Sequence, residues 1–249
     1  MKRRSDVLLL LVLTLLVSTL LPAAASAQTL DEVLARHAAA HGGLEKWRAV
    51  HSLIITGTAV NYSSAGPFVF EWRAPAAFRF EQSALGRKIL YAHDGAVTWW
   101  VQPLQGVDQP AVLPEPQAAL LRRAVAFTSP LVDAAAQGNK VELLGKDEVD
   151  GQPALKLKMT RKDGSEETWY LDPSTCLELA RVDRVLDSAG PKERWTYYSD
   201  FRAVDGLVIA HRQDQEYFIR HVALTVEKVQ VNPEIDPGRF GMKVPGSRD

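Results

Sequence analysis

Hydrophobic and polar residues alternate with a period of two along most of the chain beyond residue 50. Successive side chains of a strand point to opposite faces, so this alternation predicts β-strands. Turn signals such as Asp94-Gly95, Asp163-Gly164 and Asp205-Gly206 separate the runs. The predicted strands are 53–61, 68–73, 78–82, 88–93 and 97–102, followed by 141–149, 154–160, 167–171, 177–186, 193–199, 207–213 and 217–231. About a dozen short strands joined by tight turns predict one large, curled antiparallel sheet.

Two stretches have helical spacing instead. Residues 29–50 begin with Thr29 and Glu32 at the spacing of a capping box, and Gly42-Gly43 breaks the helix. The second stretch interrupts the strands between residues 103 and 139, where 117–127 predicts a helix and 131–136 a further helical turn. A ligand lid and a plain core helix each have one apolar stripe, so the pattern leaves both interpretations open.

The alternation also predicts that one face of the sheet is apolar. Phe70 shares a face with Trp72, Trp99 with Val101, and Trp195 with Tyr197. We expect this face to line an apolar groove beneath a helical lid at about residues 104–138, or else to be filled as a closed core that binds nothing. The predicted lining residues are Phe70, Trp72, Trp99, Val101, Leu155, Leu157, Trp169 and Leu171 from the sheet, and Leu120, Leu121, Val125 and Phe127 from the lid. The predicted rim residues, which either meet a lipid headgroup or remain solvated, are Arg73, Arg79 and Arg122.

The first 27 residues have the layout of a cleavable export signal. Three basic residues precede an apolar run of 15 residues, 7–21, and Ala25-Ser26-Ala27 follows it. A helix that spans a membrane needs about 20 apolar residues, so this run is short for an anchor. We therefore expect a signal peptide at 1–27, a single domain at 28–249 and a periplasmic protein. Removal of three basic residues and Asp6 shifts the formal net charge from −1 to −3.

Charge and cysteine content exclude two classes of protein. The chain carries 29 Lys and Arg against 30 Asp and Glu, and this balance disfavours a nucleic-acid-binding surface. The single cysteine, Cys176, excludes a scaffold held by intramolecular disulfides.

Three segments resemble the lipoprotein-sorting family, which comprises the periplasmic carriers of the lipoprotein localisation A and B type and their relatives. They are 70–80 (FEWRAPAAFRF), 91–103 (YAHDGAVTWWVQP) and 198–209 (YSDFRAVDGLVI). The resemblance implies an unclosed half-barrel of about 11 antiparallel strands, mainly β, whose concave face is capped by helices and holds acyl chains. In the carriers an arginine stands directly before the proline of the first segment and latches the lid. Here that position is Ala74, and Arg73 would face the other side of the strand.

From this resemblance we expect a non-catalytic carrier that holds lipid or lipoprotein acyl chains without a cofactor. Its expected partners are a lipid or acylated lipoprotein and an envelope membrane protein as donor or acceptor, with the chain itself a monomer. The alternative, which relatives of this fold also imply, is an envelope-stress sensor or interaction domain that binds a protein.

The sequence contains few candidates for catalysis. No G-x-S-x-G, P-loop or dinucleotide motif occurs. His37 and His41 stand four residues apart on the predicted first helix, a spacing that could supply two zinc ligands. No acidic residue lies between them as in H-E-x-x-H enzymes, so we expect a partly buried helix face rather than a metal site.

Overall fold

A computed structural model describes residues 28–61, 64–115, 117–124, 129–187, 190–217 and 220–243. The predicted signal peptide at 1–27 and the predicted lid residues Val125 and Phe127 lie outside these described residues.

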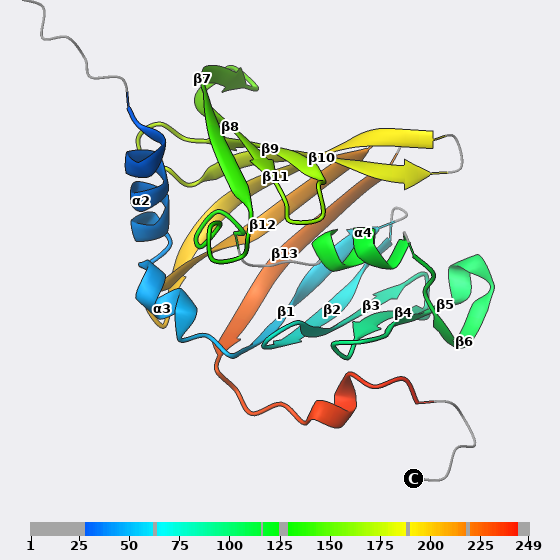
Figure 1. Cartoon of the computed structure of the whole chain (residues 1–249). Helices are drawn as coiled ribbons and strands as arrows, with labels where there is room; N and C mark the ends of the chain where they lie inside the picture. Colours follow the sequence, from blue (N-terminus) through cyan, green and yellow to red (C-terminus); the bar gives the residue numbers. More distant parts are fainter. Residues whose placement is uncertain are drawn as a thin grey trace, which may run out of the picture.

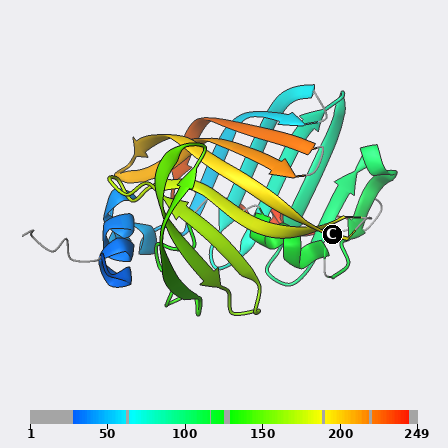
Figure 2. The ribbon, with the colours of Figure 1, turned by 90° about the horizontal axis from the view of Figure 1, so that it is seen from above.

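The described residues form one antiparallel sheet of 13 strands, whose curvature is visible in Figures 1 and 2. The strands follow the chain in two meanders, and β1 pairs with β13 to join them. Strands β6 and β7 are the two edges of the sheet, which is therefore not closed into a barrel. The first meander comprises β1 (Ser52–Asn61), β2 (Ser64–Arg73), β3 (Ala77–Ala84), β4 (Arg87–His93), β5 (Thr98–Gln102) and β6 (Val107–Val112). The second comprises β7 (Lys140–Val149), β8 (Gln152–Thr160), β9 (Glu166–Leu171), β10 (Glu178–Asp187), β11 (Gly190–Val204), β12 (Leu207–Tyr217) and β13 (Arg220–Val231).

The predicted fold class, a mainly β half-barrel with a helical cover, is confirmed. Each predicted strand has a counterpart, and the additional strand is β6. This strand was missed because it contains Pro110 and little alternation. It pairs only with β5, at the sheet edge where proline is tolerated.

The helices lie inside the curve of the sheet or at its end (Figure 1). Helix α2 (Leu30–Ala40) begins with the predicted capping box, in which the Thr29 and Glu32 side chains each accept the other's backbone N–H. The short helix α3 (Leu44–Arg48) follows the glycine break, and α4 (Gln117–Ala124) lies in the predicted lid. Residues 130–138 form consecutive turns rather than the predicted helical turn, and we call 129–138 the turn segment. None of the described helices is long and apolar enough to cross a membrane.

The outer face of β4 and β5 is covered by the C-terminal segment, which contains the 3-10 helix η3 (Pro237–Arg239). Trp99 donates its indole N–H to the carbonyl of Phe240 at 2.7 Å, and Val101 belongs to the same small cluster as Met242. Arg239 pairs with Glu71 at 2.8 Å. This end of the sheet is therefore buried on both sides, with α4 and the C-terminal segment on opposite faces (Figure 1).

The prediction of one uniformly apolar inner face is wrong in two places. Trp99 and Val101 lie on the outer face beneath the C-terminal segment. Trp195 and Tyr197 also lie on the outer face, where Trp195 stacks with both Tyr170 and Tyr197. The inner face of the corresponding strands carries a buried charge cluster that we call the Arg-Asp-Arg cluster: Arg181, Asp183 and Arg194. Alternation alone reports which residues share a face, but not which face is inside.

The elbow between α2 and α3 is held closely against the turn between β11 and β12. The backbone N–H of Val208 donates to the carbonyl of His41 at 3.0 Å. Gly42 has φ of 98°, and a Cβ atom there would lie 2.1 Å from the carbonyl oxygen of Gly206. Gly43 has almost the same φ, 99°, but nothing lies within 4 Å of its Cβ position.

We expect Gly42→Ala to lower the free energy of unfolding substantially more than Gly43→Ala. Both substitutions impose a positive φ on alanine, which costs about 1 kcal/mol or more. Only Gly42→Ala adds a clash with backbone, so the elbow must move away from the sheet. Urea unfolding of the two variants measures the difference, and equal losses would show that the close contact at Gly42 does not constrain the elbow.

Candidate functional site: a cavity between sheet, α3 and turn segment

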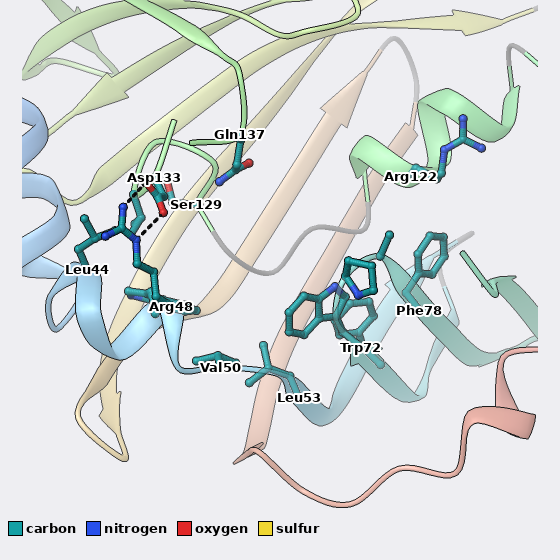
Figure 3. A pocket seen from close by; sticks show the side chains of 15 residues that line it. Leu44, Arg48, Val50, Leu53, Trp72, Phe78, Arg122, Ser129, Asp133 and Gln137 are labelled. Atoms are coloured by element: carbon teal, nitrogen blue, oxygen red, sulfur yellow. Dashed lines mark hydrogen bonds and ion pairs between the residues drawn. The ribbon is translucent and has the colours of Figure 1, made fainter. Parts of the chain in front are cut away.

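A cavity of about 460 Å³ lies between the inner face of β1–β3 and the helical cover (Figure 3). Its floor is apolar and comes from three adjacent strands: Leu53 from β1, Phe70 and Trp72 from β2, and Phe78 from β3. Along each strand these residues alternate with outward-facing ones. Across strands, direct partners such as Leu53 and Trp72 lie on the same face. Pockets that bind small ligands span about 300–1,000 Å³, so the volume is adequate for a ligand.

The walls of the cavity come from segments far apart in the sequence. Leu44, Trp47 and Arg48 of α3 form one side, and Val132, Asp133 and Gln137 of the turn segment form another. Trp47 is fixed because its indole N–H donates to the carbonyl of His41 at 2.8 Å. The same carbonyl of His41 also accepts the backbone N–H of Val208. The elbow that anchors α2 to the sheet therefore also positions Trp47 in the cavity wall.

Charged groups lie at the border of this apolar space. Arg48 donates from Nε to Asp133 Oδ2 at 2.9 Å and from Nη2 to Oδ1 at 3.2 Å, which ties α3 to the turn segment (Figure 3). Arg122 of α4 donates to Thr98 Oγ1 at 2.9 Å and to Glu115 Oε1 at 2.8 Å. Burial together with the Arg122 charge lowers the pKa of nearby His93, so this histidine is neutral beneath the helix.

The structure brings together only part of the predicted lining. Phe70, Trp72 and Arg122 line the cavity, and Leu121 packs against the same core. Leu120 is half-buried on α4 and does not line the cavity.

Leu155, Leu157, Trp169 and Leu171 lie on the inner face as predicted, but they do not border the cavity. Each is at most 4% exposed, and they form a filled core with Val33 of α2 and Leu131 of the turn segment. Helix α2 therefore packs on the half of the concave side formed by β8 and β9, and the cavity lies over the other half, at β1–β3.

The other two residues predicted at the rim, Arg73 and Arg79, do not lie at the cavity. Arg79 faces outward and pairs with Glu81 at 2.5 Å, on the side of the sheet that carries Glu71 and Arg239. Arg73 is exposed at the end of β2 and alternates with Trp72, as expected from its place in the strand. Neither arginine lines the cavity.

The residues of the cavity wall were not predicted from the sequence. Leu53 and Phe78 follow from the alternation of their strands, and cross-strand pairing with Trp72 would have placed both. Nothing local in the sequence places Arg48 opposite Asp133, because 85 residues separate them.

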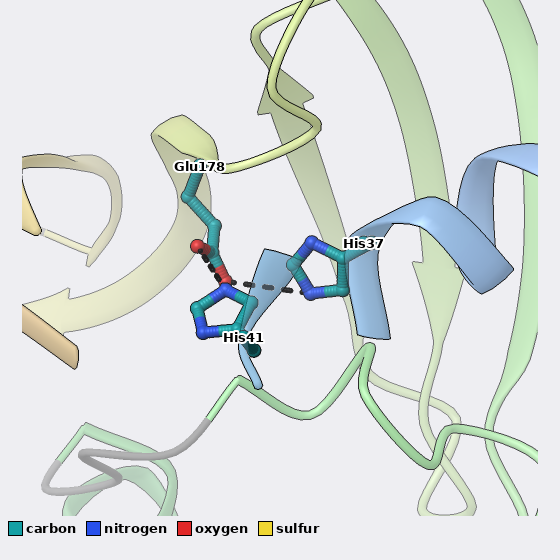
Figure 4. A group of neighbouring side chains, drawn as sticks. All are labelled: His37, His41 and Glu178. Carbon is teal, nitrogen blue, oxygen red and sulfur yellow. Dashed lines mark hydrogen bonds and ion pairs between the residues drawn. The ribbon is translucent and has the colours of Figure 1, made fainter. Parts of the chain in front are cut away.

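A second group of polar side chains lies beneath α2, next to the cavity (Figure 4). His37 and His41 share one face of the helix, as predicted, and both point toward Glu178 at the start of β10. His41 Nε2 lies 2.8 Å from Glu178 Oε2, and His37 Nε2 lies 3.6 Å from Oε1. All three residues are buried, with exposed fractions of 0–4%. We call them the His-His-Glu cluster.

The Nδ1 atoms of both histidines contact backbone oxygens. His37 Nδ1 lies 2.8 Å from the carbonyl of Cys176, and His41 Nδ1 lies 2.8 Å from that of Val208. A carbonyl can only accept, so both Nδ1 atoms carry a proton. His41 Nε2 bonds to the Glu178 carboxylate, whereas His37 Nε2 lies 3.0 Å from Ser129 Oγ and 3.6 Å from Glu178. Although burial by itself raises the pKa of Glu178, the charges of His37 and His41 hold it at about 2, so the carboxylate is ionised.

Comparison with known proteins identifies the fold. No family model and no curated protein sequence matches the chain. Among solved structures, a LolA superfamily protein from Nitrosomonas europaea is 13% identical, with a TM-score of 0.55 over 86% of this chain and 98% of its own. A Vibrio parahaemolyticus domain described as an outer membrane lipoprotein-sorting protein is 12% identical, with a TM-score of 0.52 over 84% and 94%. A DUF1329 family protein from Desulfovibrio piger is 11% identical, with a TM-score of 0.53 over 85% and 96%.

These likenesses span nearly the whole described chain and nearly the whole of each solved structure. They agree with the three sequence segments that resemble the same proteins. The chain therefore has the fold of the lipoprotein-sorting proteins of the LolA superfamily.

Proposed function

We propose that the protein is a non-catalytic carrier that holds the acyl chains of a lipid or lipoprotein in the cavity of about 460 Å³. The observation that carries this proposal is the cavity itself, because side chains do not fill the space between the cover and the inner face of β1–β3, which Leu53, Phe70 and Trp72 border. An interaction module built on the same fold would need no such space.

The lining fits an apolar chain. Each methylene transferred from water to an apolar site contributes about 0.8 kcal/mol, so a short length of acyl chain supplies useful affinity. The side chains of the floor are hydrocarbon apart from the Trp72 indole, whereas the charged side chains of Arg48, Arg122 and Asp133 lie at the border of the cavity. The two arginines are positioned to meet an anionic headgroup while the acyl chain lies on the floor.

The resemblance to proteins of the cell envelope supports the remaining parts of the proposal. In this proposal residues 1–27 are a cleaved signal peptide, 28–249 form one domain, and the protein acts in the periplasm. Residues 104–138 would act as the lid, and Arg48 with Asp133 would hold the turn segment closed over the ligand.

The proposal is tested by measuring whether the cavity holds an amphiphile. The mature chain, exported to a bacterial periplasm and purified without detergent, is analysed by native mass spectrometry and by lipid extraction. The protein freed of lipid is then titrated with a fluorescent fatty acid. We expect a bound amphiphile of one defined mass class and saturable binding of one probe per chain.

Two results would contradict the carrier. One is the absence of both co-purified amphiphile and probe binding. The other is a protein partner, captured by crosslinking in the native envelope, that binds equally well when the cavity is empty, since this result favours the alternative sensor or interaction domain.

A further inference from the structure

We propose that the His-His-Glu cluster is a binding site for a divalent transition metal ion, best suited to Zn²⁺, with His37, His41 and Glu178 as its protein ligands. The sequence offered two histidines without a third ligand, and the fold supplies it from a residue 137 positions away from His41. This inference goes beyond the acyl-chain carrier and does not depend on it.

The distances suit one shared ion. One ligand atom from each of the three residues lies within 4.8 Å of the others. Tetrahedral Zn²⁺ holds nitrogen and oxygen ligands at about 2.0–2.1 Å, which places neighbouring ligand atoms roughly 3.3 Å apart. The separations of 2.8 Å and 3.6 Å between the histidine Nε2 atoms and the Glu178 oxygens lie on either side of that value.

The surroundings of the histidines match those of metal ligands. A histidine that binds a metal through one ring nitrogen commonly donates its other N–H to a carbonyl or carboxylate, which fixes the ring. His37 and His41 both do so, through the carbonyls of Cys176 and Val208. Their Nε2 atoms both lie toward Glu178 (Figure 4). In the metal-free cluster His41 Nε2–H donates to the carboxylate at 2.8 Å, and a metal ion would take the place of this proton.

There is also space for a fourth ligand. A small void of about 20 Å³ is lined by His41, Glu178 and Ser129 among others. One water needs about 10–15 Å³, so the void beside the cluster is large enough for a single water molecule. Two histidines, one glutamate and a water make up a ligand set that zinc adopts in proteins.

A metal ion here would connect separate parts of the fold. His37 belongs to α2 and His41 caps the end of that helix, Glu178 begins β10, and Ser129 begins the turn segment that borders the cavity. Trp47 and Ser129 line both the void and the large cavity. Binding would therefore fasten α2 to the sheet directly behind the cavity wall.

The test is zinc binding by the mature chain, produced without a histidine tag and stripped with a chelator. Calorimetric titration and native mass spectrometry should find one Zn²⁺ per chain, and the ion should raise the melting temperature. Removing an outer partner of a metal ligand weakens binding about 10- to 100-fold, so Glu178→Gln and His41→Ala should lose more than about 100-fold. The matched control is His51→Ala, which removes an exposed histidine and should bind as the wild type does.

A measurement on the wild type avoids dependence on how the variants fold. Co²⁺ added to the stripped protein should give the visible absorption of a four- or five-coordinate site with nitrogen and oxygen ligands and no thiolate band. Absence of stoichiometric uptake in the wild type would overturn the proposal, and so would unchanged affinity in a folded Glu178→Gln variant. In either case the cluster is an ion pair of protonated His41 with Glu178.

Discussion

Gln137→Trp and Ala76→Trp are each expected to weaken binding of a fluorescent fatty acid at least about 10-fold, equivalent to about 1.4 kcal/mol. Both residues line the cavity and are exposed, one on the turn segment and the other in the turn between β2 and β3. An indole at either position can enter the cavity from opposite walls and occupy the space that the acyl chain needs. Filling apolar space does not expose new surface, so the melting temperature should be unchanged or higher.

The matched controls are Gln137→Ala and Ala76→Ser, which change the same positions without adding volume and should retain the wild-type affinity. Probe titration followed by fluorescence measures all four proteins. If both tryptophan variants bind the probe as tightly as the wild type, the acyl chain does not lie in this cavity and the proposed function is wrong.

Local sequence patterns predicted most of the helices and strands, but not which segments pack on each face of the sheet. The alternation predicted the strands, and the Thr29–Glu32 capping box placed the start of α2 correctly, because both signals depend on neighbouring residues. Strand β6 gave no such signal, since it contains Pro110 and has only one paired neighbour. The resemblance to the sorting proteins supplied the open shape of the sheet, which periodicity alone does not specify.

The candidate site was predicted less completely, for a physical reason. Alternation shows that Trp99 and Val101 share a face, but the inner and outer faces are distinguished only by what packs on them. Here the C-terminal segment packs on the outer face, where Phe240 accepts the Trp99 indole N–H. In the same way, α2 fills the half of the concave side that holds Leu157 and Trp169, and this leaves the cavity over β1–β3.

The Arg-Asp-Arg cluster is the least expected part of the inner face. Asp183 accepts from Arg194 Nε at 2.9 Å, and Arg181 lies 3.9 Å away on the same strand as Asp183. All three side chains are at most 8% exposed. Burying charges costs free energy, but removing one partner costs more because it leaves the others unpaired.

Asp183→Asn is therefore expected to lower the free energy of unfolding at pH 7 by about 3–5 kcal/mol. This is a large part of the stability of an ordinary domain, which is about 5–15 kcal/mol. The matched control is Asp147→Asn, which breaks an exposed pair with Lys156 and should leave the unfolding midpoint nearly unchanged. Urea unfolding followed by tryptophan fluorescence measures both variants.

The pH dependence of the free energy of unfolding tests the role of Asp183 in a second, independent way. Although burial by itself raises the pKa of Asp183, Arg181 and Arg194 together hold it below its usual value. A carboxyl whose pKa is lower in the folded state stabilises the protein fully above its unfolded pKa, about 3.9, and this contribution is lost as the pH falls through the folded pKa. The difference between wild type and Asp183→Asn should therefore be largest at neutral pH and shrink toward pH 3, because a protonated aspartate resembles asparagine. A difference that stays constant over this range would show that Asp183 acts through its shape and hydrogen bonds and not through its charge.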